Sequence, residues 1–189
     1  MENQPFASTA TEWSQETIST LTDNEHPENT YLEYKRHLRY QDDGDTSKAE
    51  WRSDLERELT AFANASGGFL IFGMSDDVEA HGIEPPDHDT SQLVNQLISG
   101  ATPPVETDVE TIPAPHGHGD RVLIVVGVPE ADRKPVATSD SAYFVRMNDH
   151  KEPMNREQIE SLFVEADRRQ QAIRQLEFEL ETFLETYRT

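Results

Sequence analysis

The feature that most constrains this sequence is an apolar run bracketed by glycines, "GGFLIFGM", over residues 67–74. A continuous run of large apolar side chains is typical of a strand buried on both faces, because an exposed face would carry polar residues at every second position. Such a strand lies inside a sheet that other elements cover on both sides. The sequence therefore predicts an α/β (α+β) fold, with a mixed central sheet flanked by helices.

The segments on either side of this run agree with that prediction. Ser47, followed three residues later by Glu50, is a capping-box signature for a helix that extends to about Ala65. Its predicted buried stripe consists of Trp51, Leu55, Leu59 and Phe62. The glycines at 67 and 68 then stand where the chain must leave the helix through a positive φ and approach other backbone closely.

Upstream, "TYLEYKRHL" (residues 30–38) alternates as a half-buried strand does. Leu32 and Tyr34 share one side of this strand. Glu33 and Lys35 share the other, which we expect to be exposed. The remaining expected elements are a short helix with Trp13, Ile18 and Leu21 on one face, a helix capped by Asp89 or Thr90, strands at 105–112, 121–128 and 142–147, and a helix from Asn155 to the C-terminus.

The C-terminal helix carries apolar residues at alternating steps of three and four, with Arg169 interrupting them: Ile159, Leu162, Ala166, Ile173, Leu176, Leu180, Phe183 and Tyr187. This spacing predicts either a short coiled coil that joins two copies or a helix packed across its own domain. The expected organisation is a tail at 1–11, a domain at 12–166 and, at 167–189, a C-terminal helix that is a candidate coiled-coil or dimerisation segment.

The charge composition indicates the kind of environment in which the protein works. The chain has 37 acidic and 16 basic residues, a formal net charge of −21, and no cysteine. Acid spread evenly over a chain keeps a surface hydrated at high salt, so we expect the cytoplasm of a salt-accumulating microbe; an ordinary acidic protein is the alternative. Disulfides and thiolate metal sites are excluded. Neither a signal peptide nor a run long enough to span a membrane is expected.

Four strings together resemble the Schlafen AlbA_2 domain family: "ENTYLEYK", "ELTAFANASGGFLIFGMSDD", "RVLIVVGVPEADRKPV" and "AYFVRMNDHKEPMNREQIESLF". They occur in the family's order and cover about residues 12–166. The chain thus resembles a single-lobe microbial member, and its acidity points to a halophilic archaeon. The resemblance implies the fold of that domain and an activity on nucleic acid.

RNA-cleaving members of that family hold a divalent metal with three acids, and the resemblance places these at Glu28, Glu33 and Asp76. Carboxylates of this kind suit Mg²⁺ or Mn²⁺, which can activate a water and stabilise charge on a phosphate. Lys35, beside Glu33, would contact the phosphate and complete the catalytic set. The substrate implied is structured RNA such as tRNA. In a chain this acidic, the same carboxylates can instead be ordinary surface residues.

Basic residues are few, but several gather near the predicted strands. The expected contacts to RNA or DNA are Lys35, Arg36, Arg39, Arg133, Lys134, Arg146 and Lys151. Any of them can instead form an ion pair within the protein. No glycine-rich loop followed by Lys-Ser or Lys-Thr is present, so we expect no ATP site.

Two functions follow from these residues. The first is a metal-dependent endoribonuclease, and the second is a DNA- or RNA-binding or regulatory module that does not cleave. Schlafen cores join two lobes into a clamp around RNA, whereas this chain provides one lobe. A homodimer formed through the C-terminal helix would rebuild such a clamp.

Overall fold

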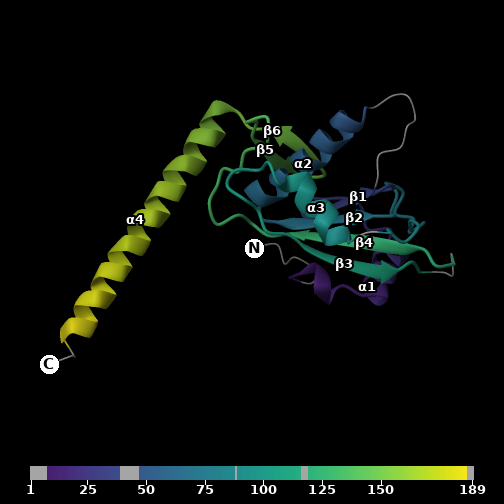
Figure 1. Cartoon of the computed structure of the whole chain (residues 1–189), viewed down its shortest axis with the longest axis horizontal. Helices are drawn as coiled ribbons and strands as arrows, with labels where there is room; N and C mark the ends of the chain where they lie inside the picture. Colours follow the sequence, from purple (N-terminus) through teal and green to yellow (C-terminus); the bar gives the residue numbers. More distant parts are fainter. Residues whose placement is uncertain (1–7, 39–46, 88, 116–118, 187–189) are drawn as a thin grey trace.

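The computed structural model describes residues 8–38, 47–87, 89–115 and 119–186, which form one domain and a long helix that leaves it (Figure 1). Its elements are η1 (Ala10–Glu12), α1 (Gln15–Asp23), β1 (Leu32–Lys35), α2 (Lys48–Asn64), β2 (Gly68–Phe72), α3 (Thr90–Ile98), β3 (Asp108–Pro113), β4 (Val122–Val128), β5 (Phe144–Met147), β6 (His150–Pro153) and α4 (Arg156–Thr186).

The main sheet has the order β1-β2-β4-β3. β1 and β2 are parallel, and α2 lies between them in the chain, whereas β2 with β4 and β3 with β4 are antiparallel. β5 and β6 form a separate hairpin, and β5 packs against α2. The predicted mixed sheet with flanking helices is confirmed.

The sheet is buried on both faces. Leu70 and Phe72 belong to the core formed with α2 and α3, while Phe69 and Ile71 belong to the core formed with η1 and α1. Figure 1 shows α3 and α1 on opposite sides of the sheet. Residues of β4 alternate in the same way, with Ile124 and its neighbours divided between the two cores. The strand predicted from the glycine-bracketed run therefore separates two apolar layers.

The boundary between α2 and β2 depends on the two glycines. Gly67 has a φ of 74°, and a Cβ on it would lie 2.7 Å from the carbonyl oxygen of Val128. A Cβ on Gly68 would lie 2.4 Å from the ring of Phe62. At the other end of α2 the predicted capping box is present, with Ser47 Oγ accepting from the Glu50 amide at 3.2 Å. Both ends of this helix follow from local sequence.

Two segments differ from the sequence predictions. The second strand of the hairpin, β6, was expected to be a connection before Asn155. Ala10, expected in the N-terminal tail, is buried against the sheet, and the side chain of Asp108 accepts a hydrogen bond from its amide. The apolar pattern missed β6 because its side chains are mostly exposed and polar. It missed Ala10 because the partner of that residue, Asp108, is remote in the sequence.

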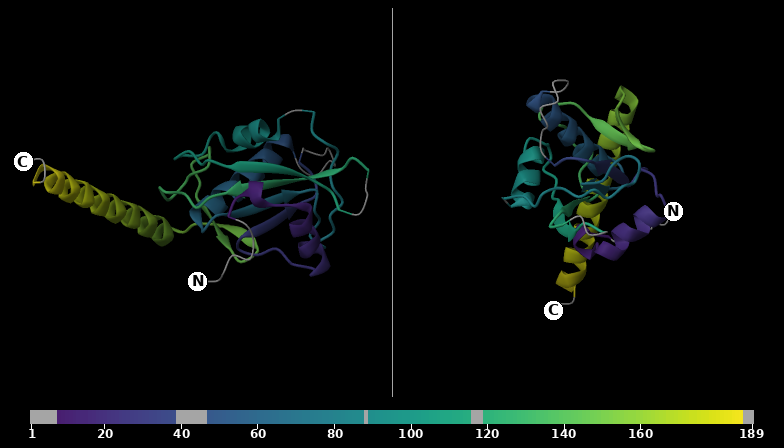
Figure 2. Two further views of the ribbon diagram at one scale, coloured as in Figure 1. Left: turned by 90° about the horizontal axis from the view of Figure 1, so that it is seen from below. Right: turned by 90° about the vertical axis from the view of Figure 1, so that its right-hand side faces the viewer.

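α4 projects from the domain as a single long helix (Figure 2). Only its first turns are partly covered, through Ile159, Leu162 and Ala166. Farther along, Leu176 is 64% exposed and Leu180 59% exposed. Packing across its own domain therefore describes only the beginning of this helix.

Candidate functional site

The candidate acidic residues surround β1, which forms one edge of the main sheet. Alternation along this strand directs Leu32 and Tyr34 into the core that lies between the sheet and α1. Glu33 then faces the side occupied by α2 and β5, and it is only 5% exposed. The prediction that Glu33 lies on an exposed face is wrong, because α2 and the hairpin cover that face; Lys35 keeps partial exposure.

Glu33 is one member of a buried charge cluster, which we define as Glu33, Lys35, Asp54, Glu58, Arg146 and Lys151. Arg146 Nη2 lies 2.6 Å from Glu33 Oε2, and its Nη1 lies 3.0 Å from Glu58 Oε2. Lys35 pairs with the other oxygen of Glu33. Lys151 Nζ lies 2.5 Å from Glu58 Oε1 and 2.9 Å from Asp54 Oδ1. Three acids and three bases thus balance each other at the junction of β1, α2 and the hairpin.

Arg146 is the centre of this cluster. Its guanidinium also donates to the carbonyl oxygens of Asn29, Leu32 and Asp149 at 3.1–3.3 Å and lies 4.8 Å from the ring centroid of Phe62. With 3% exposure, it is not available to a phosphate. The prediction that Arg146 contacts nucleic acid is therefore corrected, and we assign it a structural role.

The cluster shifts the ionisation of its members. Burial opposes the charge on Lys35, but Glu33 and then Glu58 and Glu28 outweigh it and raise the pKa of Lys35. Burial and the neighbouring Glu33 carboxylate raise the pKa of Glu58, against the attraction of Lys151 and Lys35. Ion pairs therefore offset much of the desolvation that these charges suffer.

Glu28 lies outside the cluster, at the free edge of β1. Its Oε1 accepts a hydrogen bond from the Tyr34 amide at 2.7 Å, which satisfies an edge-strand donor that no neighbouring strand reaches. Burial raises the pKa of Glu28, the Tyr34 amide opposes this, and the charges of Glu33 and Asp76 add to the increase. Glu28 therefore makes a structural hydrogen bond, and the charges of both other predicted metal ligands also act on its carboxylate.

Asp76 is exposed, four residues after the end of β2. Its influence on Glu28 indicates that the predicted acids share one region. Within the described ranges, however, no group of three or more His, Asp or Glu residues is arranged to hold a metal. Because both oxygens of Glu33 contact cations, a metal ion would have to displace Lys35 or Arg146. The arrangement therefore does not fit a three-carboxylate metal centre.

The other predicted basic contacts fall into three groups. Lys35 and Lys151 belong to the charge cluster, and Lys134 pairs with Glu130 at 2.7 Å and donates to the carbonyl of Ala65. Arg36 and Arg133 are exposed, and no ion pair holds either of them within the described residues. Arg39 lies outside the described residues. Of the whole set, Arg36 and Arg133 are thus the described residues open to an external partner.

Glu58 was missed by the sequence analysis, although the signal was present. It lies three residues after Leu55 and four before Phe62, on the buried stripe of α2. An acid at such a position needs a cation, and the cation here comes from β5, 88 residues away. The position of Glu58 was visible in the sequence; its partner was not.

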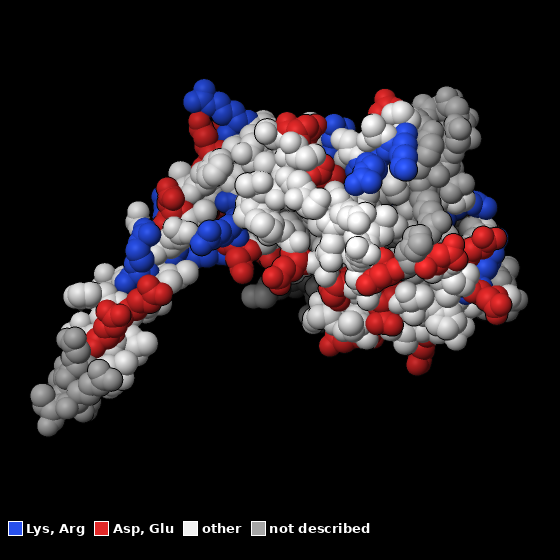
Figure 3. All heavy atoms as spheres, viewed as in Figure 1, with Lys and Arg blue, Asp and Glu red and all other residues white. Residues whose placement is uncertain are grey.

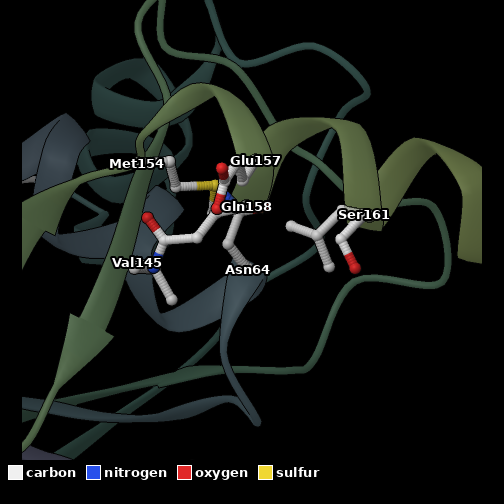
Figure 4. A pocket seen from close by; sticks show the side chains of 7 residues that line it. Asn64, Val145, Met154, Glu157, Gln158 and Ser161 are labelled. Atoms are coloured by element: carbon white, nitrogen blue, oxygen red, sulfur yellow. The ribbon is translucent and has the colours of Figure 1, made fainter.

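A cavity of about 390 Å³ lies where α4 meets the domain, lined by Asn64, Val145, Met154, Glu157, Gln158, Ser161 and Leu162 (Figure 4). Asn64 donates to the carbonyls of Val136 and Phe144 at 2.8 and 2.9 Å, and its oxygen accepts from the Val136 amide at 2.6 Å. Its amide group is fully used in holding the loop between β4 and β5. The cavity is therefore a feature of the α4 junction, separate from the acidic residues near β1.

Comparison with known proteins defines the class of this domain. The family model "Schlafen, AlbA_2" matches residues 28–155, which include β1, the charge cluster and the hairpin. The chain belongs to the Schlafen AlbA_2 family. This membership associates it with a nucleic-acid-related function.

The chain was also compared with curated proteins and with solved structures. No curated protein matches the sequence. Among solved structures, the chain is similar to the DIP2311 protein from Corynebacterium diphtheriae, with a TM-score of 0.49 and 15% identity over 74% of this chain. The chain spans 29% of that protein's length. No helix within the described residues is long and apolar enough to cross a bilayer.

Proposed function

We propose that this chain binds nucleic acid without cleaving it. Family membership supports the nucleic-acid part of the proposal. The observation that supports the absence of cleavage is the ion pair between Glu33 and Arg146, at 2.6 Å in the protein interior. A carboxylate held in this way fixes β1 against β5, and it is not free to act on a substrate.

Binding is tested most directly with fluorescence anisotropy, using a labelled 20-nucleotide RNA, the same sequence as DNA, and tRNA. The proteins are the full chain and a variant in which exposed Arg36 is replaced by Gln. We expect saturable binding by the full chain and weaker binding by Arg36→Gln. Because 37 acidic residues repel phosphates at long range, the titration is repeated from low to molar salt, where this repulsion is screened. No binding at any salt concentration would leave a protein-interaction module as the remaining function.

The second candidate is a metal-dependent endoribonuclease acting on structured RNA. It is favoured by one feature: the charges of both Glu33 and Asp76 raise the pKa of Glu28, so the predicted acids lie within electrostatic range of one another. The geometry does not fit the metal centre, and the endoribonuclease stays a prediction.

Its test is incubation of tRNA with the full chain and with a Glu28→Gln and Asp76→Asn double variant, with Mg²⁺, with Mn²⁺ and with chelator. These positions are preferable to Glu33, whose substitution would disturb the charge cluster. Metal-dependent cleavage by the full chain alone would establish this candidate and overturn the non-cleaving proposal. Cleavage by both proteins would identify a contaminant or a different site.

We also propose that the outer part of α4 joins two copies of the chain. Ile173, Leu176 and Leu180 follow one another at steps of three and four, so they share one face of the helix, and they are 49–64% exposed. An exposed apolar face of this kind favours association. Pairing of two such helices would cover this face and bring two lobes together. Light scattering of the full chain at molar salt tests this, and a monomer at micromolar concentration would exclude it.

A further inference from the structure

We propose that the groove between α4 and the loop joining β4 to β5 binds the phosphodiester backbone of a nucleic acid. We define the α4 groove by Asp132 and Arg133 on the loop and by Arg169, Ile173 and Arg174 on the helix. Its volume is about 580 Å³. This inference rests on the proposed function and gives it a location distinct from the acidic residues at β1.

The α4 groove concentrates positive charge in an acidic protein. Three arginines and one aspartate line it, although the chain as a whole carries a net charge of −21. On the visible face, basic side chains include several on the part of α4 near the body, while acidic side chains lie both along α4 and over the body (Figure 3). The groove therefore differs in sign from the molecule that contains it.

Two of these arginines are not used by the protein itself. Arg133 and Arg174 have neither an ion pair nor a side-chain hydrogen bond within the described residues, although both are exposed. Arg169 lies 3.7 Å from Glu165 and donates to the Asp132 carbonyl at 3.5 Å, a weak pairing that links helix to loop. The α4 groove thus presents two exposed arginines that no acid within the described residues neutralises.

The shape of the groove suits a chain of phosphates. A guanidinium donates two parallel hydrogen bonds to a phosphate, and these remain effective at short range when salt screens distant charges. Arg133 on one wall and Arg174 on the other would contact different phosphates. Ile173, which lines the groove from the same helix as Arg174, supplies an apolar side chain against which a sugar or base can pack.

The anchoring of the loop that carries Arg133 also supports binding of a nucleic acid in the α4 groove. This loop is held by Asn64 through Val136 and by Lys134 through the Ala65 carbonyl. Both anchors belong to the C-terminal end of α2. A cationic side chain on an anchored loop loses less conformational entropy on binding than one on a free loop.

The test compares two double variants with the same change in charge. Arg133→Gln with Arg174→Gln removes two of the three groove cations, while Arg156→Gln with Arg168→Gln removes two exposed cations of α4 that do not line the groove. Affinity for the labelled RNA and DNA 20-mers is measured by anisotropy at several salt concentrations. We expect the groove variant to bind about tenfold or more weakly, with a smaller salt dependence, and the control to bind within about twofold of the parent.

The outcomes separate this inference from the function on which it rests. If the parent binds neither nucleic acid, the proposed function fails, and the inference fails with it. If the parent binds and both variants bind equally well, the inference alone is overturned. If the groove variant keeps its affinity but its mass by light scattering falls, the groove holds a second copy of the chain, which also overturns it. Equal losses for RNA and DNA would support recognition of phosphates alone.

Discussion

Arginine serves opposite purposes in the charge cluster and in the α4 groove. Arg146 lies inside the domain, paired with Glu33 and Glu58 and bonded to three backbone carbonyls. Arg174 is exposed on a helix outside the domain and has no ion pair within the described residues. The comparison teaches that the number of basic residues in an acidic chain says little about its capacity to bind nucleic acid. A basic side chain that stabilises the fold through internal ion pairs cannot also contact an external ligand.

The domain and the outer part of α4 also differ in the exposure of their apolar side chains. The domain buries its apolar residues in two layers on either side of one sheet. The outer part of α4 leaves Leu176, Phe178 and Leu180 in solvent. Changes in the domain are therefore expected to act on stability, and changes on α4 on association and binding. The following predictions test this division, from the largest expected change in the free energy of unfolding to the smallest.

Replacing Arg146 with Met should have the largest effect. The substitution leaves Glu33 and Glu58 as buried carboxylates without their main cation, and breaking a buried pair of this kind costs about 3–5 kcal/mol. Chemical denaturation at constant salt measures this loss. Arg168→Met, at an exposed position of α4, is the control and should change the free energy of unfolding by less than about 0.5 kcal/mol. A loss below about 1 kcal/mol for Arg146→Met would contradict the structural role.

Replacing Asn64 with Ala should have the next largest effect. It removes three hydrogen bonds to Val136 and Phe144 and leaves buried backbone groups unpaired, with a cost of about 2–4 kcal/mol in the free energy of unfolding. Because the affected loop carries Arg133, affinity for nucleic acid should fall as well. Asn95→Ala, which loses one long bond to Thr107, serves as the control. Unchanged affinity in a folded Asn64→Ala variant would count against an anchored loop.

Alkaline pH should weaken the region around β1. Burial, and then the charge of Glu28, raises the pKa of Tyr34 above its ordinary value of 10.0, and the pKa of Lys35 is also raised. The unfolded chain therefore loses these protons first, so the free energy of unfolding falls as pH rises above 10.0, by up to about 1.4 kcal/mol per pH unit for each group. Thermal unfolding across this range should show a shallower decline for Tyr34→Phe. An unchanged slope would remove Tyr34 as its source.

Replacing Leu176 and Leu180 with Gln should have the smallest effect on stability, within about 0.5 kcal/mol, because both side chains are exposed. The same double variant should instead reduce the mass measured by light scattering. Neither leucine lines the α4 groove, so nucleic-acid affinity per chain should be largely retained. A large loss of stability in a monomeric parent would show that this part of α4 packs on its own domain.

The sequence predicted what depends on neighbouring residues. The capping box of Ser47, the glycine turn at Gly67 and the strand that follows are local features, and the structure confirms them. Apolar spacing of three and four also identified α4 as a helix. It could not give the direction of α4, because that depends on where Ile159 and Leu162 meet the domain.

The environment of the candidate acids could not be read in the same way. Alternation in β1 correctly separated Glu33 from Leu32 and Tyr34, but alternation distinguishes two faces without saying what covers each. Glu33 is buried because α2 and β5 arrive from distant parts of the chain. The pairing of Arg146 with two glutamates is likewise a product of tertiary structure.

α4 begins only two residues after β6, with Met154 and Asn155 between them. At 1.5 Å per residue its 31 residues form an arm about 45 Å long, rooted in the hairpin that holds Arg146. Such an arm acts as a lever. A force applied at its tip, by a second copy or by a bound nucleic acid, would reach the hairpin through a connection of two residues, so α4 and the ion pairs of Glu33 and Glu58 would be mechanically coupled.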